Sequence, residues 1–280
     1  MIKDILVHIP TERPLRPVVD ASISLATAFG AHIDATAIGY ISTGTAYVTD
    51  GSAAGAVAAV FEMEQRRAAE RSAAALAVFE AEARSAGISY GCSSIEDLPA
   101  EAASTIGVAA RLYDLAVVQQ PDAAQEAFDN AIPTEVLLHA GGPVLFVPHI
   151  FRGTFKPKRI GICWDGSRLA ARALKDARPF LSQADTLVTI SINEAQVAPA
   201  AASAQKLVQH MARTGLVTRL IELTAARSEI QPSIPSLAAD DSVDMLVMGA
   251  YGHSRLQERI LGGVTRAMLQ TMTVPTLMSH

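Results

Sequence analysis

Four glycines near the end of the sequence have the spacing of a phosphate-binding turn. Gly249 and Gly252 follow the apolar run 245–248, and nine residues separate Gly252 from the pair Gly262 and Gly263. Glycine after a buried strand lets the backbone adopt positive φ and approach a ligand closely. Free backbone N–H groups there, followed by the start of a helix, bind anions. The glycines alone fit equally well an ordinary strand-to-helix turn and helix stop without a ligand.

An acidic side chain follows an earlier strand of the same half. Asp165 comes directly after the apolar run 159–164. In an open parallel sheet, ligands lie beyond the C-terminal strand ends where the strand order reverses, so Asp165, the strand end near Ile192 and the glycine turn should meet. A carboxylate there can accept hydrogen bonds from a ribose hydroxyl or a base amine. The simpler alternative is that Asp165 or Ser167 caps the next helix, and Trp164 is expected to pack in the core.

The segments that must position these residues alternate between strand and helix patterns. Short apolar runs bounded by turn residues indicate strands, and runs with a period near 3.6 indicate helices. Such alternation predicts βαβ units, a parallel sheet and right-handed crossovers. Strands are expected at residues 4–9, 32–40, 88–94, 115–119, 143–147, 159–164, 186–192, 217–223, 245–248 and 275–278. Helices are expected at residues 14–29, 56–86, 99–112, 132–140, 167–181, 200–214, 233–239 and 264–271, and a loop at 41–55.

An internal repeat decides the domain organisation. DLAVV at 114–118 corresponds to DMLVM at 244–248, and PVLFVPH at 143–149 corresponds to PTLMSH at 275–280. The chain is therefore expected to hold two copies of one α/β domain, residues 1–148 and 158–280, joined by a linker at 149–157. The apolar last strand of each copy would lie at a sheet edge, which must be covered or paired. We expect these two strands to pair across a pseudo-two-fold axis as an intramolecular dimer; association of two chains stays open.

Composition and missing motifs narrow the function. The net charge of −5 favours neither nucleic acid nor an acidic membrane surface. No uncharged apolar run reaches the roughly 18 residues of a membrane span, and the N-terminal MIKDILVHIP lacks the apolar core of a signal peptide. A cytoplasmic protein with two free thiols is expected. The sequence has no P-loop, nucleophile elbow or His-Glu-x-x-His motif, and its histidines are scattered, so we assign no catalytic residue and no metal site.

In combination, these motifs resemble the universal stress protein family. Asp165 after a first strand, then Gly249-x-x-Gly252, nine residues and Gly262-Gly263, is similar to the family pattern of Gly-x-x-Gly, nine residues, and Gly followed by Ser or Thr. The resemblance covers the chain as two tandem domains, and the second domain matches better. It implies doubly wound parallel sheets of the Rossmann-like, adenine nucleotide alpha hydrolase-like type, and many family members bind ATP.

The resemblance also implies roles for single residues. Adenosine would contact Asp165 and Ile192, and ribose with the first phosphates would lie on the glycine turn. The backbone N–H groups after Gly262 would bind the distal phosphates of ATP, with or without magnesium, and Thr265 would supply a hydroxyl. The implied nucleotide-binding residues are Asp165, Ile192, Met248, Gly249, Gly252, Gly262, Gly263, Val264 and Thr265.

Two departures from the family pattern weaken this expectation. Nucleotide-binding members usually carry Ser or Thr where this chain has Gly263, and one lost hydrogen bond to a charged group, worth roughly 1.5–3 kcal/mol, weakens binding without abolishing it. In the first half, Pro10 or Thr11 stands at the aspartate position. The loop after Val118 lacks the glycines, and its acids Asp122, Glu126 and Asp129 would repel phosphate. The first half is therefore not expected to bind nucleotide in the same way.

Three functions remain open from the sequence. The first is a stress-response regulator with one adenine-nucleotide site in the second half. The second is a structural module that binds a regulatory protein partner with both nucleotide sites empty, a role for which the charged helix at 56–86 is one candidate surface. The third is a slow ATPase, for which Asp165, His253 and Thr265 are the residues within reach of a terminal phosphate.

Overall fold

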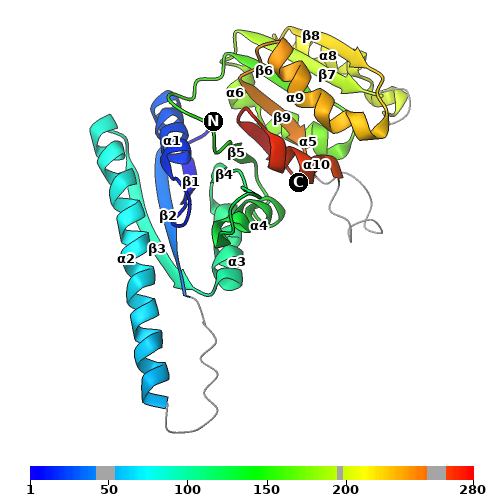
Figure 1. Ribbon diagram of the computed structural model, residues 1–280. Coiled ribbons are helices and arrows are strands. Elements are labelled where there is room, and N and C mark those ends of the chain that lie inside the picture. Colours follow the sequence, from blue (N-terminus) through cyan, green and yellow to red (C-terminus); the bar gives the residue numbers. More distant parts are fainter. Residues whose placement is uncertain (42–53, 194–197, 251–262) are drawn as a thin grey trace.

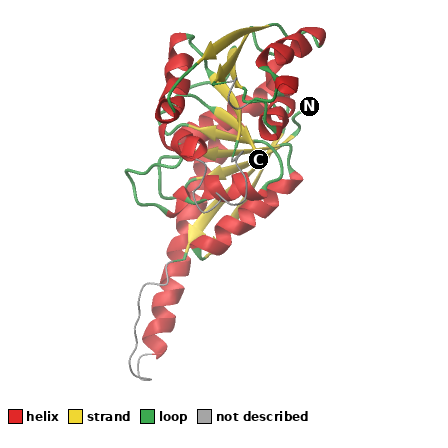
Figure 2. Ribbon diagram, turned by 90° about the vertical axis from the view of Figure 1, so that its right-hand side faces the viewer, coloured by secondary structure: helices red, strands yellow, loops and turns green. Residues whose placement is uncertain are grey.

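The structure is a computed structural model that describes residues 1–41, 54–193, 198–250 and 263–280. Its strands form one ten-stranded sheet with helices on both faces (Figures 1 and 2). The predicted α/β class is confirmed. Within the described residues, no helix combines the length and the apolar character needed to cross a bilayer.

The first half of the chain supplies five strands and four α-helices within the described residues. In chain order they are β1 (Asp4–Ile9), α1 (Arg16–Phe29), β2 (His32–Tyr40), α2 (Ala54–Ala86), β3 (Tyr90–Asp97), α3 (Pro99–Ala109), β4 (Leu115–Gln119), α4 (Ile132–His139) and β5 (Val144–Val147).

The second half repeats this order. Its elements are β6 (Arg159–Cys163), α5 (Arg168–Asp176), α6 (Arg178–Leu181), β7 (Thr186–Ile192), α8 (Ala204–Arg213), β8 (Thr218–Leu223), α9 (Ile230–Asp240), β9 (Met245–Gly249), α10 (Gly263–Thr271) and β10 (Thr276–Ser279).

The sheet order is β3-β2-β1-β4-β5-β10-β9-β6-β7-β8. Neighbouring strands within each half are parallel, and β5 pairs with β10 antiparallel, with Leu145 opposite Leu277. The predicted pairing of the two last strands is therefore confirmed. Because the order of the second half mirrors that of the first, the halves are related by a pseudo-two-fold relation at this seam.

Two apolar layers fill the space between sheet and helices, and both contain residues from both halves. The first packs under α1, α2, α5 and α8 and includes Phe79, Ala173 and Phe180. The second packs under α3, α4, α9 and α10 and includes Ile106 and Met268. Strands covered on both faces explain the near-continuous apolar runs in the sequence.

Several element boundaries differ from the expected ones for local reasons. The helix expected at 167–181 is divided at Ala177, because Pro179 has no N–H to continue the hydrogen-bond ladder of α5. The helix expected at 200–214 starts as α8 only after Ser203, whose hydroxyl accepts from the backbone N–H of Lys206. Strand β3 starts and ends later than expected and runs to Asp97. Most of the loop expected at 41–55 lies outside the described residues.

The segment expected as a linker packs against the body of the molecule. Phe155 is buried, and its backbone N–H donates to the hydroxyl of Ser24 on α1 at 3.0 Å. Phe29 on α1 and Phe180 on α6 meet edge to face, with ring centroids 5.3 Å apart. The halves are therefore joined by side-chain packing as well as by the β5–β10 seam.

Candidate functional site

The candidate site of the second half lies at the C-terminal ends of β9, β6 and β7, which are neighbours in the sheet. From β6 the chain continues to β7 on one side, whereas β9 lies on the other side, so the strand order reverses between β6 and β9. This is the topological switch point at which open α/β sheets bind ligands. Helix α10 returns the chain from β9 to its parallel neighbour β10, so its first residue, Gly263, starts at the same edge.

The turn after β6 is organised by its own side chains. The hydroxyl of Ser167 accepts from the backbone N–H of Ala170 at 3.1 Å and caps α5, and Asp165 Oδ1 accepts from the backbone N–H of Ser167 at 2.9 Å. Gly166 between them has φ +70°, and a Cβ there would lie 3.1 Å from the carbonyl oxygen of Ala202. The capping alternative is thus confirmed. The side chain of Asp165 is nevertheless exposed at the edge of the site.

Gly249 is required by packing. A Cβ at this position would lie 2.5 Å from the backbone nitrogen of Ala170 and 2.6 Å from the carbonyl carbon of Leu169. The first glycine of the motif therefore lets the end of β9 lie directly on the first turn of α5. This contact is needed whether or not a ligand binds.

The end of β7 has a feature that the sequence reasoning missed. Ile192 is half-buried, and the next residue, Asn193, is buried with a left-handed backbone of φ 57°. Its side chain donates to the carbonyl of Ala225 at 2.7 Å and accepts from the backbone N–H of Ala225 at 2.9 Å. Asn adopts this conformation more readily than most residues, so an Asn directly after a strand was the available signal. Asn193 holds the loop after β8 against the site edge.

The structure describes only some of the other nucleotide-binding residues that the resemblance implies. Met248 and Thr265 are buried, so their side chains belong to the interior beside the edge. Gly252 and Gly262 lie outside the described residues, as does His253, and the side chain of Val264 is not described either. The expectation that Trp164 packs in the core is confirmed, because it is buried and its indole N–H donates to the carbonyl of Ala202 at 2.8 Å.

In the first half, the corresponding edge is filled by the chain itself. The register places Pro10 where the second half has Asp165, and Gln119 where it has Gly249. Asp129, from the loop after β4, is fully buried. Its carboxylate accepts from the backbone N–H groups of Thr11 at 3.0 Å and Glu12 at 2.9 Å.

Further polar groups surround this buried carboxylate. The hydroxyl of Tyr40, at the end of β2, donates to Asp129 Oδ1 at 2.8 Å. His8 Nε2 lies 3.5 Å from the same oxygen, and burial lowers the pKa of His8 to about 4 although the carboxylate opposes the shift. Arg13 is buried as well and donates to the carbonyl of Gln120 at 2.6 Å. An internal anion therefore occupies the place at which an external anion would meet the N–H groups after β1.

The role of Asp129 differs from the one expected from the sequence. We expected its charge, with those of Asp122 and Glu126, to repel phosphate from an open loop. The structure shows Asp129 turned inward as a hydrogen-bond acceptor, which closes the edge physically. The sequence signal for this role was the position of Asp129, just before the helix that leads to the last strand of the first half. The second half has its glycine pair at the corresponding place.

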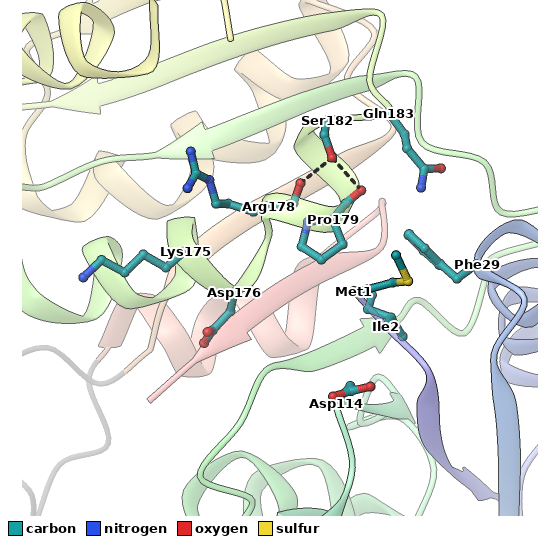
Figure 3. A pocket seen from close by; sticks show the side chains of 10 residues that line it. All are labelled: Met1, Ile2, Phe29, Asp114, Lys175, Asp176, Arg178, Pro179, Ser182 and Gln183. Carbon is teal, nitrogen blue, oxygen red and sulfur yellow. Dashed lines mark hydrogen bonds between the residues drawn. The ribbon is translucent and has the colours of Figure 1, made fainter. Parts of the chain in front are cut away.

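A hollow of about 530 Å³ lies elsewhere, between the two halves (Figure 3). Phe29 and Ile2 of the first half and Pro179 of α6 give it apolar walls, with Asp114 and Arg178 also lining it. None of the implied nucleotide-binding residues lines it. Over the described ranges, the structure contains no group of three His, Cys, Asp or Glu side chains that could hold a metal ion.

Comparisons with known proteins agree with this architecture. The family model described as the universal stress protein family matches residues 156–280. A universal stress protein of Synechocystis is 24% identical over 142 residues, which are 48% of this chain and 46% of that protein. The chain thus matches less than half the length of this relative.

Solved structures extend the likeness to the whole chain. A universal stress protein from Archaeoglobus fulgidus is 15% identical, with a TM-score of 0.73, and the match covers 98% of this chain and 97% of that one. A protein of unknown function from Pseudomonas aeruginosa is 16% identical, with a TM-score of 0.61 over 99% of this chain and 92% of that one. At these identities the likeness shows a shared fold. The family match itself covers the second half of the chain, residues 156–280, which resembles the universal stress protein family.

Proposed function

We propose that the second half of this protein binds an adenine nucleotide, with ATP as the leading candidate, and that the chain acts as a nucleotide-dependent stress-response regulator. The observation that carries the proposal is the position of the motif in the fold. Asp165 lies in the turn after β6, Ile192 and Gly249 end the neighbouring strands β7 and β9 at the switch point, and Gly263 begins the helix that returns from β9. The N-terminal end of such a helix favours phosphate.

The stoichiometry follows from the difference between the halves. The carboxylate of Asp129 already accepts hydrogen bonds from the backbone N–H groups of Thr11 and Glu12. A phosphate that bound there in the first half would have to displace this buried charge. Breaking such a network costs several kcal/mol. The proposal is therefore one nucleotide per chain.

Titration calorimetry of the full chain with ATP and magnesium tests the proposal. We expect one site per chain, with binding lost in Gly252→Val and weakened in Asp165→Asn. Ala123→Val is the matched control, because Ala123 is exposed in the corresponding loop of the first half and should leave binding unchanged. Absence of heat at millimolar ATP, or equal loss in the control, would contradict the proposal.

A second candidate is a partner-binding module without nucleotide. The observation that favours it is the filled edge of the first half, together with Gly263 in place of a hydroxyl residue. Thermal unfolding separates the candidates, because a ligand that binds only the native state raises the midpoint by mass action. A midpoint that stays constant from zero to millimolar ATP supports the partner-binding module.

A further inference from the structure

The N-terminal part of α2 extends past the end of the sheet. Strand β2 ends at Tyr40, whose carbonyl accepts from Arg71 at 2.8 Å, and Gly39 packs so closely on α2 that a Cβ would lie 2.5 Å from the carbonyl oxygen of Ala68. Residues 54–67 precede this contact, and at 1.5 Å per residue they extend about 20 Å beyond it. Figures 1 and 2 show this part of α2 projecting from the molecule. We refer to residues 54–67 as the α2 arm.

The α2 arm exposes large apolar side chains in a short stretch. Val60, Phe61 and Met63 are 46%, 45% and 42% exposed. Farther along the same helix, Ala75 and Phe79 are buried in the layer under the sheet. A group of exposed large apolar side chains on a projecting element is typical of an interaction surface.

The charges of the arm favour a second copy as the partner. Glu62 and Glu64 precede Arg66 and Arg67, so the arm is acidic first and basic second, and within the helix Arg67 already donates to Glu64 at 2.9 Å. Two arms side by side in opposite directions place each acidic pair near the basic pair of the other, whereas parallel arms place like charges together. A two-fold interface requires a surface that is complementary to itself. The antiparallel arrangement meets this requirement.

The edge of the sheet from which the arm projects, at the end of β2, also exposes apolar side chains. Leu98, just after β3, is 37% exposed, and Phe128, whose ring centroid lies 5.4 Å from that of Tyr40, is 44% exposed. Two copies that face each other with antiparallel arms would bring the tip of each arm to this edge of the other copy. The edge would then cover exposed apolar side chains of the arm, such as Val60 and Phe61.

We propose that the α2 arm is a self-association surface through which two copies of this chain form a two-fold dimer with antiparallel arms. A pair of helical segments about 20 Å long buries less than the roughly 1,600 Å² of a standard stable interface. The dimer is therefore reversible and depends on protein concentration. It uses neither the β5–β10 seam nor the edge proposed for nucleotide.

Sedimentation of the full chain from about 1 to 100 µM tests this proposal. We expect a monomer–dimer equilibrium in that range, and at least a tenfold weaker dimer in Phe61→Ser. Val78→Ser is the matched control, because Val78 is 41% exposed on the same helix but lies beside the sheet rather than on the arm. Circular dichroism should show unchanged folding in both variants. A chain that stays monomeric at 100 µM overturns the proposal.

Charge reversal tests the orientation. Glu62→Arg with Glu64→Arg should abolish the dimer, because four like charges would then face four like charges. Adding Arg66→Glu and Arg67→Glu to that variant should restore it, because the order of charges is inverted but still self-complementary. A dimer that persists in the first variant, or fails to return in the second, contradicts antiparallel pairing of the arms.

Discussion

At the scale of single residues, the first half differs from the second in the group that satisfies the N–H donors after its first strand. Asp129 takes this role from within the chain, with Tyr40 as a further donor and His8 beside it. In the second half, the N–H group of Ser167 after the first strand donates to Asp165 within the same turn. One duplicated fold thus has one closed edge and one edge with an exposed carboxylate.

Removal of the Asp129 carboxylate should strongly destabilise the protein. Asp129→Ala leaves the donors on Thr11, Glu12 and Tyr40 without their acceptor in a buried place, so we expect the free energy of unfolding to fall by about 3 kcal/mol or more. Urea unfolding measures the loss, and Glu126→Gln, an exposed change in the same loop, is the control. Added formate should restore part of the stability of Asp129→Ala alone. A loss no larger than that of the control would refute the role of this carboxylate.

The buried imidazole of His8 predicts a pH dependence. Its pKa is lowered by burial to about 4, whereas the unfolded chain binds a proton near pH 6.5. Above pH 6.5 both states are neutral and His8 contributes no pH dependence. As pH falls from 6.5 to 4 the unfolded state is protonated first, so stability is lost, by about 2 kcal/mol between pH 7 and pH 5.

Replacing His8 should remove this component. Urea unfolding at pH 7 and pH 5 should show a smaller acid-side loss in His8→Leu than in the unchanged protein. His139→Gln, at an exposed position on α4, is the control and should retain the original slope. An equal loss in His8→Leu would show that other groups govern this pH range.

At the scale of elements, the close contact between β9 and α5 requires glycine at the last position of β9. Gly249→Ala places a methyl group against the backbone of Leu169 and Ala170, and we expect a loss of about 1–3 kcal/mol in the free energy of unfolding. Gly142→Ala is the matched control, because its φ is not positive and its nearest neighbour is the carbonyl oxygen of Tyr113 at 3.9 Å. Thermal unfolding of both variants measures the difference, and equal midpoints would contradict the packing role.

Most elements were predictable because each follows from local chemistry. Gly30 ends α1 in the left-handed conformation, and the pattern of β2 predicts its bounds, His32–Tyr40. The division of the α5 region at Ala177 follows from Pro179, which lacks the N–H of a helical residue, and the periodicity of apolar positions does not register this. The inward turn of Asp129 depends on contacts with Thr11 and Tyr40, distant in sequence, and local patterns carry no such information. The nucleotide residues stay predictions, since the structure describes their frame but not the loop between Gly249 and Gly263.

At the scale of the whole molecule, the two halves share their cores. Both apolar layers contain residues from both halves, and the β5–β10 seam makes the sheet continuous. Arg172 on α5 donates to the carbonyl of Gly141, which follows α4, and adds a polar contact across the halves. A duplicated fold joined in this way should unfold as one unit.

Cooperative unfolding can be measured because the chain has a single tryptophan. Trp164 reports on the second half by fluorescence, whereas circular dichroism reports on the helices of both halves. We expect the two urea transitions to coincide, since coincident probes indicate two-state behaviour. Leu277→Ala, at a fully buried position on the seam, should lower both midpoints together, with a loss of about 2–5 kcal/mol. If the fluorescence transition moves and a separate part of the circular dichroism transition does not, the first half folds independently and the shared cores do not couple the halves.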